Sequence, residues 1–219
     1  MDDAAQAEAY AFADFAEPHE RFVALFRERH PGFEPREVLD LGCGPADPTR
    51  RFARAFPGCR IAGVDGSPAM LALGEVANRE AGLDARISLV CSYLPDLPLP
   101  AARFDAVVSN SLLHHLADPD VLWETVLRHA RPDARIFVMD LFRPRDEQTV
   151  RALVAEHAAG APPVLQRDFE RSLRAAYRPD EIACQLERAS LSHLAIEQIS
   201  DRHLIVHGSM RGPAEEDRP

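Results

Sequence analysis

The sequence predicts an α/β fold in which a doubly wound, mostly parallel sheet has helices on both faces. Three observations indicate it. An apolar run at residues 37–41 ends in two closely spaced glycines, Gly42 and Gly44, and a helical pattern follows them. A second apolar run ends in a carboxylate, Asp65, about 20 residues farther along, which is the distance that one crossover helix requires. Strand-like and helix-like segments then alternate, as they do in parallel βαβ units.

Length and composition indicate a single globular domain. The chain has 219 residues, with 46% hydrophobic and 27% charged residues, which is ordinary for a soluble protein. It has no apolar run near the roughly 20 residues that span a bilayer. The N-terminus, Met1-Asp2-Asp3, lacks the basic start of a secretory signal. We therefore expect a cytoplasmic protein that does not enter a membrane.

The charge balance weighs against nucleic acid as the main partner. The formal net charge is −10, whereas proteins that bind a phosphate backbone usually present a basic face. All 25 basic residues are arginine, which we interpret as a bias of genome composition. The oligomeric state is left open by the sequence.

The four cysteines indicate neither a zinc knuckle nor a disulfide framework, because no C-x-x-C pair is present. They are Cys43, Cys59, Cys91 and Cys184. We expect them to be small buried residues, although Cys43 could reach solvent because it lies in the glycine turn. No metal site is predicted.

The glycine turn carries the most specific signal in the sequence. Gly42 and Gly44 allow the backbone to turn tightly and to approach a ligand without an intervening Cβ. Asp47 is a favoured N-cap and Pro48 a favoured first helical residue, so we expect a helix over residues 47–56. Nicotinamide and flavin fingerprints place a third glycine three residues after the second one. Asp47 stands at that position instead.

The spacing Asp40-x-Gly42-x-Gly44-x-Ala46 resembles motif I of the class I S-adenosylmethionine-dependent methyltransferases. Ala46 stands where that family usually has its last glycine. The matching strand pattern covers residues 36–141 and the final hairpin. The resemblance implies a Rossmann-like sheet of seven strands, in which the sixth strand is parallel and the last strand returns antiparallel between the fifth and the sixth.

The strands and helices are expected in the following places. Strands are predicted at residues 37–41, 60–65, 86–91, 104–109, 134–141, 193–199 and 203–206. Helices are predicted at residues 47–56, 146–159 and 167–176, and after Ser67, Asp118 and Pro179, with a break at 131–133. We divide the single domain, residues 1–219, into a helical lid (1–34), a cofactor-binding core (35–144), a helical substrate-shaping insertion (145–177), a final helix and hairpin (178–208) and a flexible tail (209–219). The N-terminal helices have an alternative role as simple packing elements on the sheet.

The resemblance implies that S-adenosyl-L-methionine binds at the carboxyl ends of the strands. Asp65 would accept hydrogen bonds from the vicinal ribose hydroxyls, or else serve only as an acid near the next helix N-terminus. Gly66 or Met70 would flank the adenine, and Ser92 stands where the family commonly has an acid that binds the adenine amino group. The Asn110 region would meet the methionine moiety. The expected cofactor-binding residues are Asp40, Gly42, Gly44, Asp65, Gly66, Met70, Ser92, Tyr93 and Asn110.

Two adjacent histidines, His114 and His115, are the catalytic candidates. A neutral imidazole can take a proton from a hydroxyl, thiol or ammonium nucleophile near neutral pH. The alternative is that the pair only shapes the pocket, and a metal site would need a third ligand that the sequence does not place.

The acceptor is expected to be a small molecule. DNA and RNA amino-methyltransferases often carry Asn/Asp-Pro-Pro-aromatic after the fourth strand, where the ring stacks on a flipped base. Residues 110–113 read Asn-Ser-Leu-Leu, with neither proline nor ring.

Five further residues are candidates for contact with that acceptor. Tyr10 and His19 are the only N-terminal side chains of obvious chemical use, and Tyr177 is the main polar candidate of the insertion. Arg143 could hold a substrate carboxylate or simply cap a loop. Arg202 lies in the turn between the last two strands, where a salt-bridged hairpin turn is the alternative.

The expected function is transfer of a methyl group from S-adenosyl-L-methionine to the small molecule by in-line displacement, in which the enzyme mainly holds the two reactants together. A protein that binds the cofactor without catalysis, as a regulator, is the first alternative. A nicotinamide-dependent oxidoreductase is the second.

Overall fold

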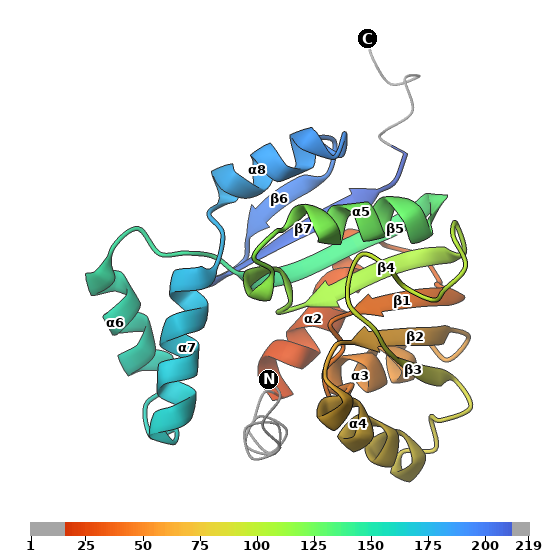
Figure 1. Cartoon of the computed structure of the whole chain (residues 1–219), viewed down its shortest axis with the longest axis horizontal. Coiled ribbons are helices and arrows are strands. Elements are labelled where there is room, and N and C mark those ends of the chain that lie inside the picture. Colours follow the sequence, from red (N-terminus) through yellow and green to blue (C-terminus); the bar gives the residue numbers. More distant parts are fainter. Residues whose placement is uncertain (1–15, 212–219) are drawn as a thin grey trace.

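A computed structural model describes residues 16–211 as a seven-stranded sheet covered by helices on both faces (Figure 1). The strand order is β3-β2-β1-β4-β5-β7-β6, and β7 runs antiparallel to both β5 and β6. This order confirms the predicted fold class. The strands are β1 (Glu37–Leu41), β2 (Arg60–Asp65), β3 (Ile87–Cys91), β4 (Phe104–Asn110), β5 (Ala130–Leu141), β6 (Ala195–Gln198) and β7 (His203–Ser209).

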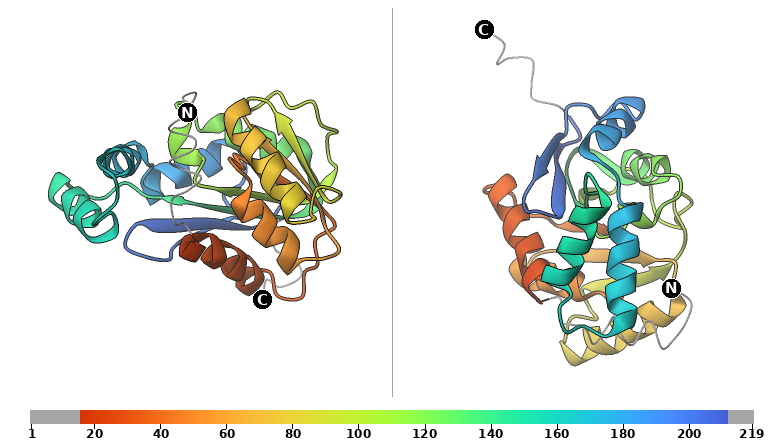
Figure 2. Two further views of the ribbon diagram at one scale, coloured as in Figure 1. Left: turned by 90° about the horizontal axis from the view of Figure 1, so that it is seen from below. Right: turned by 90° about the vertical axis from the view of Figure 1, so that its left-hand side faces the viewer.

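The helices form two layers and a separate pair. Helices α2 and α3 pack on one face of the sheet, α5 and α8 cover the other, and α6 and α7 stand beyond the carboxyl ends of the parallel strands (Figures 1 and 2). Their bounds are α2 (Ala16–Arg29), α3 (Asp47–Ala55), α4 (Pro68–Glu80), the 3-10 turn η1 (Leu113–His115), α5 (Asp120–His129), α6 (Glu147–His157), α7 (Pro163–Ala175) and α8 (Pro179–Arg188). Within residues 16–211, no helix is long and apolar enough to cross a bilayer.

An aromatic cluster fixes α2 on the sheet. The Phe26 ring centroid lies 4.8 Å from that of Phe52 and 5.5 Å from that of Phe56, both in or next to α3, and 5.7 Å from that of Phe137 in β5. All three ring pairs are edge-to-face, the arrangement that aromatic quadrupoles favour. From Ala16 onward the N-terminal segment is therefore anchored by core packing.

The opposite layer is joined by a buried polar contact. The indole Nε1 of Trp123 in α5 donates a hydrogen bond of 3.1 Å to Gln185 Oε1 in α8, and both residues are buried. Because the indole N–H has its partner, the large ring can sit in the core without an unsatisfied donor.

Three local predictions differ from the structure. The helix α5 ends at His129, as the break at 131–133 predicts, but β5 begins at Ala130 and not at residue 134, because the strand bulges between the pairs Phe104↔Ala130 and Ala106↔Arg135. The N-cap of α3 is Ala46, in a left-handed conformation with φ 60, and not Asp47. Cys91 and Cys184 are exposed, although the sequence predicted small buried residues, whereas Cys43 and Cys59 are buried.

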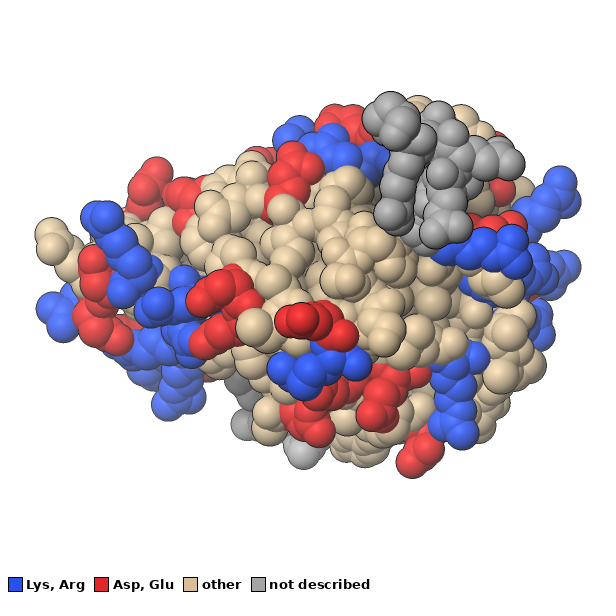
Figure 3. Space-filling model, turned by 90° about the horizontal axis from the view of Figure 1, so that it is seen from above, with Lys and Arg blue, Asp and Glu red and all other residues tan. Residues whose placement is uncertain are grey.

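The surface carries mixed charge. Seen from above, acidic and basic side chains are interspersed over this face (Figure 3). Because the basic side chains in this view mostly lie beside acidic ones, they form no continuous basic stripe that could bind a phosphate backbone.

The buried His30 makes the stability of the fold depend on pH. The His30 ring follows α2, lies 4.9 Å from the Phe26 ring, and its Nε2 has no hydrogen-bond partner among the described residues. Burial, then the nearby His207 and Arg135, lower its pKa from 6.5 to about 4. The unfolded chain therefore takes up a proton at higher pH than the folded one. The contribution of His30 to the free energy of unfolding is complete above pH 6.5 and is lost as the pH falls toward 4.

Replacing His30 with leucine is expected to flatten that dependence. The loss of unfolding free energy between pH 7 and pH 5, measured by urea unfolding, should shrink by about 2 kcal/mol. His193→Leu, at an exposed histidine, is the matched control and should leave the loss unchanged. An equal loss in His30→Leu and the parent protein would contradict the assignment.

Candidate active site

The two glycines of the turn after β1 have different surroundings. Gly42 has φ +72, and a Cβ there would lie 2.8 Å from the Leu112 Cβ, so only glycine lets the segment after β4 pack on the turn. Gly44 has φ +51, and a Cβ there would meet nothing within 4 Å. The backbone at Gly44 therefore borders open space at the carboxyl edge of the sheet.

The two glycines should respond differently to alanine. Gly42→Ala adds left-handed strain and a clash with Leu112, so the free energy of unfolding should fall by about 3 kcal/mol. Gly44→Ala adds strain alone and should cost about 1 kcal/mol. Urea unfolding of the two variants checks this pair, and equal losses would show that the contact with Leu112 is not what requires glycine.

Asp65, at the end of β2, is held by the turn. Its Oδ2 accepts a hydrogen bond of 2.9 Å from Gly44 N, and its Oδ1 accepts one of 2.8 Å from Ser67 N. The side chain is only half-buried. Each carboxylate oxygen has a second lone pair, so the group can accept further hydrogen bonds from a ligand. The glycine motif and the acid are thus in direct contact.

The end of β4 carries two signs of function. Asn110 Oδ1 is buried and has no hydrogen-bond partner within residues 16–211. The next residue, Ser111, adopts φ 59, and its N–H donates to Met139 O at 2.9 Å. Unsatisfied polar atoms and left-handed non-glycine residues persist mainly where a ligand or a mechanism requires them.

His114 forms a buried pair with Asp140. Its Nδ1 lies 2.5 Å from Asp140 Oδ1, and the two side chains are 4% and 1% exposed. The carboxylate also accepts from the backbone N–H of Leu141 at 2.6 Å, which fixes its position at the end of β5. An ionised acid at this nitrogen holds the proton on Nδ1 and leaves Nε2 as the basic nitrogen of the neutral ring.

The His115 ring lies beside the His114 ring, with centroids 4.0 Å apart and ring planes tilted by 40°. The residue is exposed at the cavity, although protein atoms surround much of its imidazole. The loss of solvent around the imidazole, and then the neighbouring His114, lower the pKa of His115 to about 4. His115 is therefore neutral at physiological pH.

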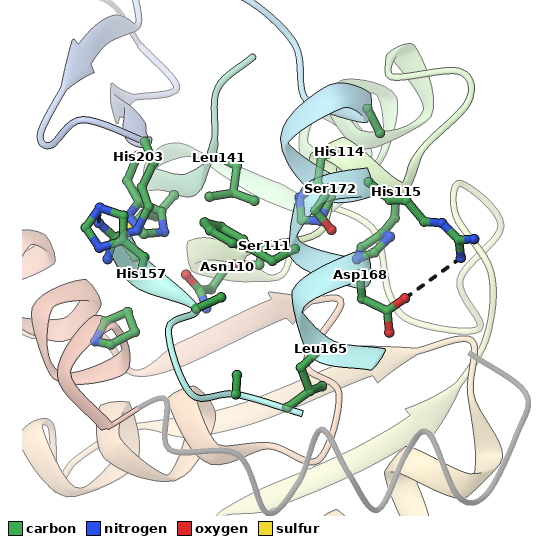
Figure 4. A pocket seen from close by; sticks show the side chains of 18 of the residues that line it. Asn110, Ser111, His114, His115, Leu141, His157, Leu165, Asp168, Ser172 and His203 are labelled. Carbon is green, nitrogen blue, oxygen red and sulfur yellow. Dashed lines mark hydrogen bonds and ion pairs between the residues drawn. The ribbon is translucent and has the colours of Figure 1, made fainter. Parts of the chain in front are cut away.

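A cavity of about 780 Å³ opens at this edge (Figure 4). Asn110 and Ser111 lie in its centre, His157 and His203 on one side, and His114, His115, Asp168 and Ser172 on the other. It is lined by Glu17, Pro18, His19, Asn110, Ser111, His114, His115, Met139, Leu141, His157, Ala158, Ala161, Pro162, Leu165, Asp168, Phe169, Arg171, Ser172, Ala175, Arg202 and His203. Its walls thus come from the strand ends, the start of α2, and the α6–α7 pair.

Known proteins share this architecture. Residues 38–133 match the model of a family described as a methyltransferase domain. A trans-aconitate 2-methyltransferase of Mycolicibacterium gilvum (strain PYR-GCK) is 41% identical over 98 residues, which cover 43% of this chain and 35% of that protein. One from Azoarcus sp. (strain BH72) is 28% identical over 201 residues, covering 87% and 72%. The crystal structure of a SAM dependent methyltransferase from Aquifex aeolicus matches with a TM-score of 0.71 and 17% identity, over 96% of this chain and 100% of that one.

The family match covers the glycine motif, and the structural match extends over 96% of the chain. Residues 38–133 are thus similar to methyltransferase domains, and the sheet has the strand order that the resemblance to the class I S-adenosylmethionine-dependent methyltransferases implies. The chain spans between about a third and about half of the length of the first relatives that it matches.

The chain places its other expected cofactor residues around the Asp65 edge. Asp40 is buried beneath the turn and accepts a hydrogen bond of 2.6 Å from Thr49 Oγ1; burial is the main reason that its pKa rises to about 6. Met70 is 2% exposed. Gly66 lies under the ring of Tyr93, where a Cβ would be 2.6 Å from a ring carbon, and Tyr93 itself is 73% exposed.

Ser92 lies beside this group with its hydroxyl already engaged. Its Oγ donates to Asp96 O at 3.1 Å, and its N–H donates to Asp65 O at 3.1 Å. As folded here, Ser92 therefore supports the loop after β3, and its hydroxyl would have to change partner to contact an adenine.

The five expected substrate residues separate into three groups. His19 and Arg202 line the cavity, and His19 Nδ1 lies 2.7 Å from Asp47 Oδ2. Arg143 and Tyr177 are absent from the lining: Arg143 pairs with Glu181 of α8, and the Tyr177 hydroxyl donates to Leu116 O at 2.6 Å. Tyr10 falls outside the described residues.

Sequence reasoning missed part of the site. Asp140, the buried partner of His114, is not among the predicted site residues. Its position at the end of a strand was the available signal, and the pairing itself required the packing of η1 against β5. His157, Asp168 and Ser172 carry no motif and reach the cavity only because α6 and α7 fold over it.

One group of possible metal ligands lies at the cavity rim. Glu156, His157 and Asp201 offer ligand atoms within 4.8 Å of one another, and all three are exposed. The guanidinium Nη1 of Arg202 is 2.8 Å from His157 Nε2, so a positive charge already occupies the neighbourhood of that nitrogen. We assign no metal role to this group.

Proposed function

We propose that this protein transfers the methyl group of S-adenosyl-L-methionine to a small molecule held in the 780 Å³ cavity. The observation that carries the proposal is the meeting of two half-sites at Asn110 and Ser111. On one side lie Asp65 and the open backbone of Gly44, and on the other lies the cavity with His114. A donor and an acceptor bound in these halves would face each other across one short segment.

The residues present fit the cofactor. Asp65 retains lone pairs for two ribose hydroxyls, while Gly44 leaves room where any other residue would place a side chain. The orphaned Asn110 Oδ1 suits a donor such as the methionyl ammonium group. When bound, the cofactor supplies a methyl group made electrophilic by its positive sulfur. The chain's own contribution is to hold both reactants in contact and to exclude water.

The acceptor half favours a small molecule. The α6–α7 pair, within the segment 145–177 that we assign to substrate shaping, closes the cavity to a volume typical for drug-sized ligands. Two relatives are named for methyl transfer to trans-aconitate, which is also a small molecule. The Asn-Ser-Leu-Leu segment after β4 lacks the ring that stacks on a flipped base.

Transfer of label tests the proposal. The purified protein is incubated with S-adenosyl-L-methionine labelled in its methyl group and with deproteinised metabolite extracts. Label should pass into a new small-molecule product, with S-adenosylhomocysteine as the by-product. If calorimetry shows that S-adenosylhomocysteine binds but no extract is labelled, the protein is a non-catalytic binder. Binding of NAD without binding of S-adenosylhomocysteine would indicate an oxidoreductase.

A further inference from the structure

The positive charges at the cavity are already engaged. Arg202 Nη1 lies 3.0 Å from Asp201 Oδ1 and 2.8 Å from His157 Nε2. Arg171 pairs with Asp168 at 4.0 Å, and its side chain is 77% exposed, so it belongs to the rim and remains in water. Of the two guanidinium groups in the described lining, that of Arg202 is thus balanced by the charge of Asp201, and that of Arg171 lies in water.

The histidine side chains of the cavity do not supply a positive charge in place of the two arginines. The pKa values of His115 and His203 are lowered to about 4, in both cases first by loss of solvent, so both rings are neutral near pH 7. His19 is paired with Asp47. Glu17 adds negative charge to the lining. A carboxylate that moved from water into this cavity would lose its hydration without gaining a cation in return.

The His114–Asp140 pair points to an acceptor that carries a proton. A carboxylate is already ionised at neutral pH and needs no base before it attacks a methyl group. A hydroxyl group must lose its proton, and an imidazole oriented by a buried acid is suited to accept it. The buried pair, 2.5 Å apart and on the cavity wall, would have no task with a carboxylate acceptor.

We propose that the acceptor is an uncharged, largely apolar molecule that is methylated on a hydroxyl oxygen, with His114 as the base and Asp140 as its positioning residue. This inference rests on the proposed function and narrows its acceptor. In the step, the acceptor oxygen forms a bond to the methyl carbon, the S–CH3 bond breaks with its electron pair left on sulfur, and the hydroxyl proton passes to His114 Nε2. The acceptor thus differs in class from trans-aconitate, the carboxylate in the names of two relatives.

The chemistry of the labelled product tests this inference, whichever molecule in the extract is the acceptor. The product from the extract is treated with mild alkali, which hydrolyses methyl esters to volatile methanol but leaves methyl ethers intact, and is then passed over a cation exchanger, which retains methylated amines. We expect the label to be stable to alkali and to pass through the exchanger. Volatile or retained label would overturn the inference alone, whereas unlabelled extracts would overturn the proposed function and this inference with it.

A defined panel provides the second arm. Each hydroxybenzene is paired with the benzoate of the same substitution pattern, and the hydroxyl member should have a kcat/KM at least about 100-fold higher. Leu165, an uncharged residue of the cavity wall, offers a gain-of-function control (Figure 4). Leu165→Arg adds a guanidinium to the cavity wall and should lower the preference for the hydroxyl member over the benzoate at least about tenfold. Equal or better methylation of the benzoates by the parent protein would overturn the proposal.

Discussion

Asp65→Asn is expected to weaken the binding of S-adenosylhomocysteine by about 100-fold. The carboxylate is held by Gly44 N and Ser67 N, and each oxygen retains a lone pair with which it can accept a hydrogen bond from a ribose hydroxyl. An amide replaces one acceptor oxygen with a donor and removes the charge that strengthens hydrogen bonds to hydroxyls, a loss of roughly 3 kcal/mol for two such bonds. Titration calorimetry measures the affinity directly.

The controls separate binding from folding. Asp84→Asn, at an exposed acid in the loop before β3, should leave the affinity unchanged. Urea unfolding of Asp65→Asn shows whether the substitution also lowers the free energy of unfolding by weakening the hydrogen bonds from Gly44 N and Ser67 N. If Asp65→Asn binds S-adenosylhomocysteine as tightly as the parent protein, the ribose is held elsewhere and Asp65 serves only the N-terminus of α4.

His114→Gln should lower kcat by about 10²-fold to 10⁴-fold for a weakly acidic hydroxyl acceptor, with the affinity for S-adenosylhomocysteine unchanged. Asp140→Asn should also lower kcat, because an amide at 2.5 Å no longer holds the ring with its proton on Nδ1. Both variants remove the proton acceptor or its orientation and leave the cofactor half intact. Steady-state kinetics with calorimetry distinguishes these effects.

The acidity of the acceptor gives a readout that a purely structural role would not produce. A phenol that is already ionised at the assay pH needs no base, so the two variants should recover much of their rate with acidic phenols and little with weakly acidic ones. His193→Gln, at an exposed histidine away from the cavity, should keep the rate with every acceptor. A loss of the same size across the whole phenol series would show that His114 and Asp140 only maintain the shape of the pocket.

The sequence was most informative where local chemistry and topology agree. Residues 37–41 and 60–65 form strands with the predicted bounds, because each is a buried apolar run ended by glycine or by Asp65. The spacing between the glycines and Asp65 placed the acid at the correct edge, and the structure adds the direct contact with Gly44. Because a single crossover helix joins these two strands, the spacing determines the edge of the sheet at which Asp65 lies.

The remaining features depend on packing that no local pattern reveals. Pro132 follows the end of α5, as predicted, yet the bulge opposite Phe104 accommodates it within β5. His114 and Asp140 are 26 residues apart and meet because η1 packs on the end of β5. Arg143 had two roles open to it, and the acid on α8 that pairs with it could be identified only in three dimensions.

The most direct test of the account is a crystal structure of the protein with S-adenosylhomocysteine. The account predicts both ribose hydroxyls within hydrogen-bonding distance of Asp65, and the sulfur at Asn110 and Ser111, facing the cavity that His114 lines. A ribose bound away from Asp65, or a sulfur that points away from the cavity, would contradict it.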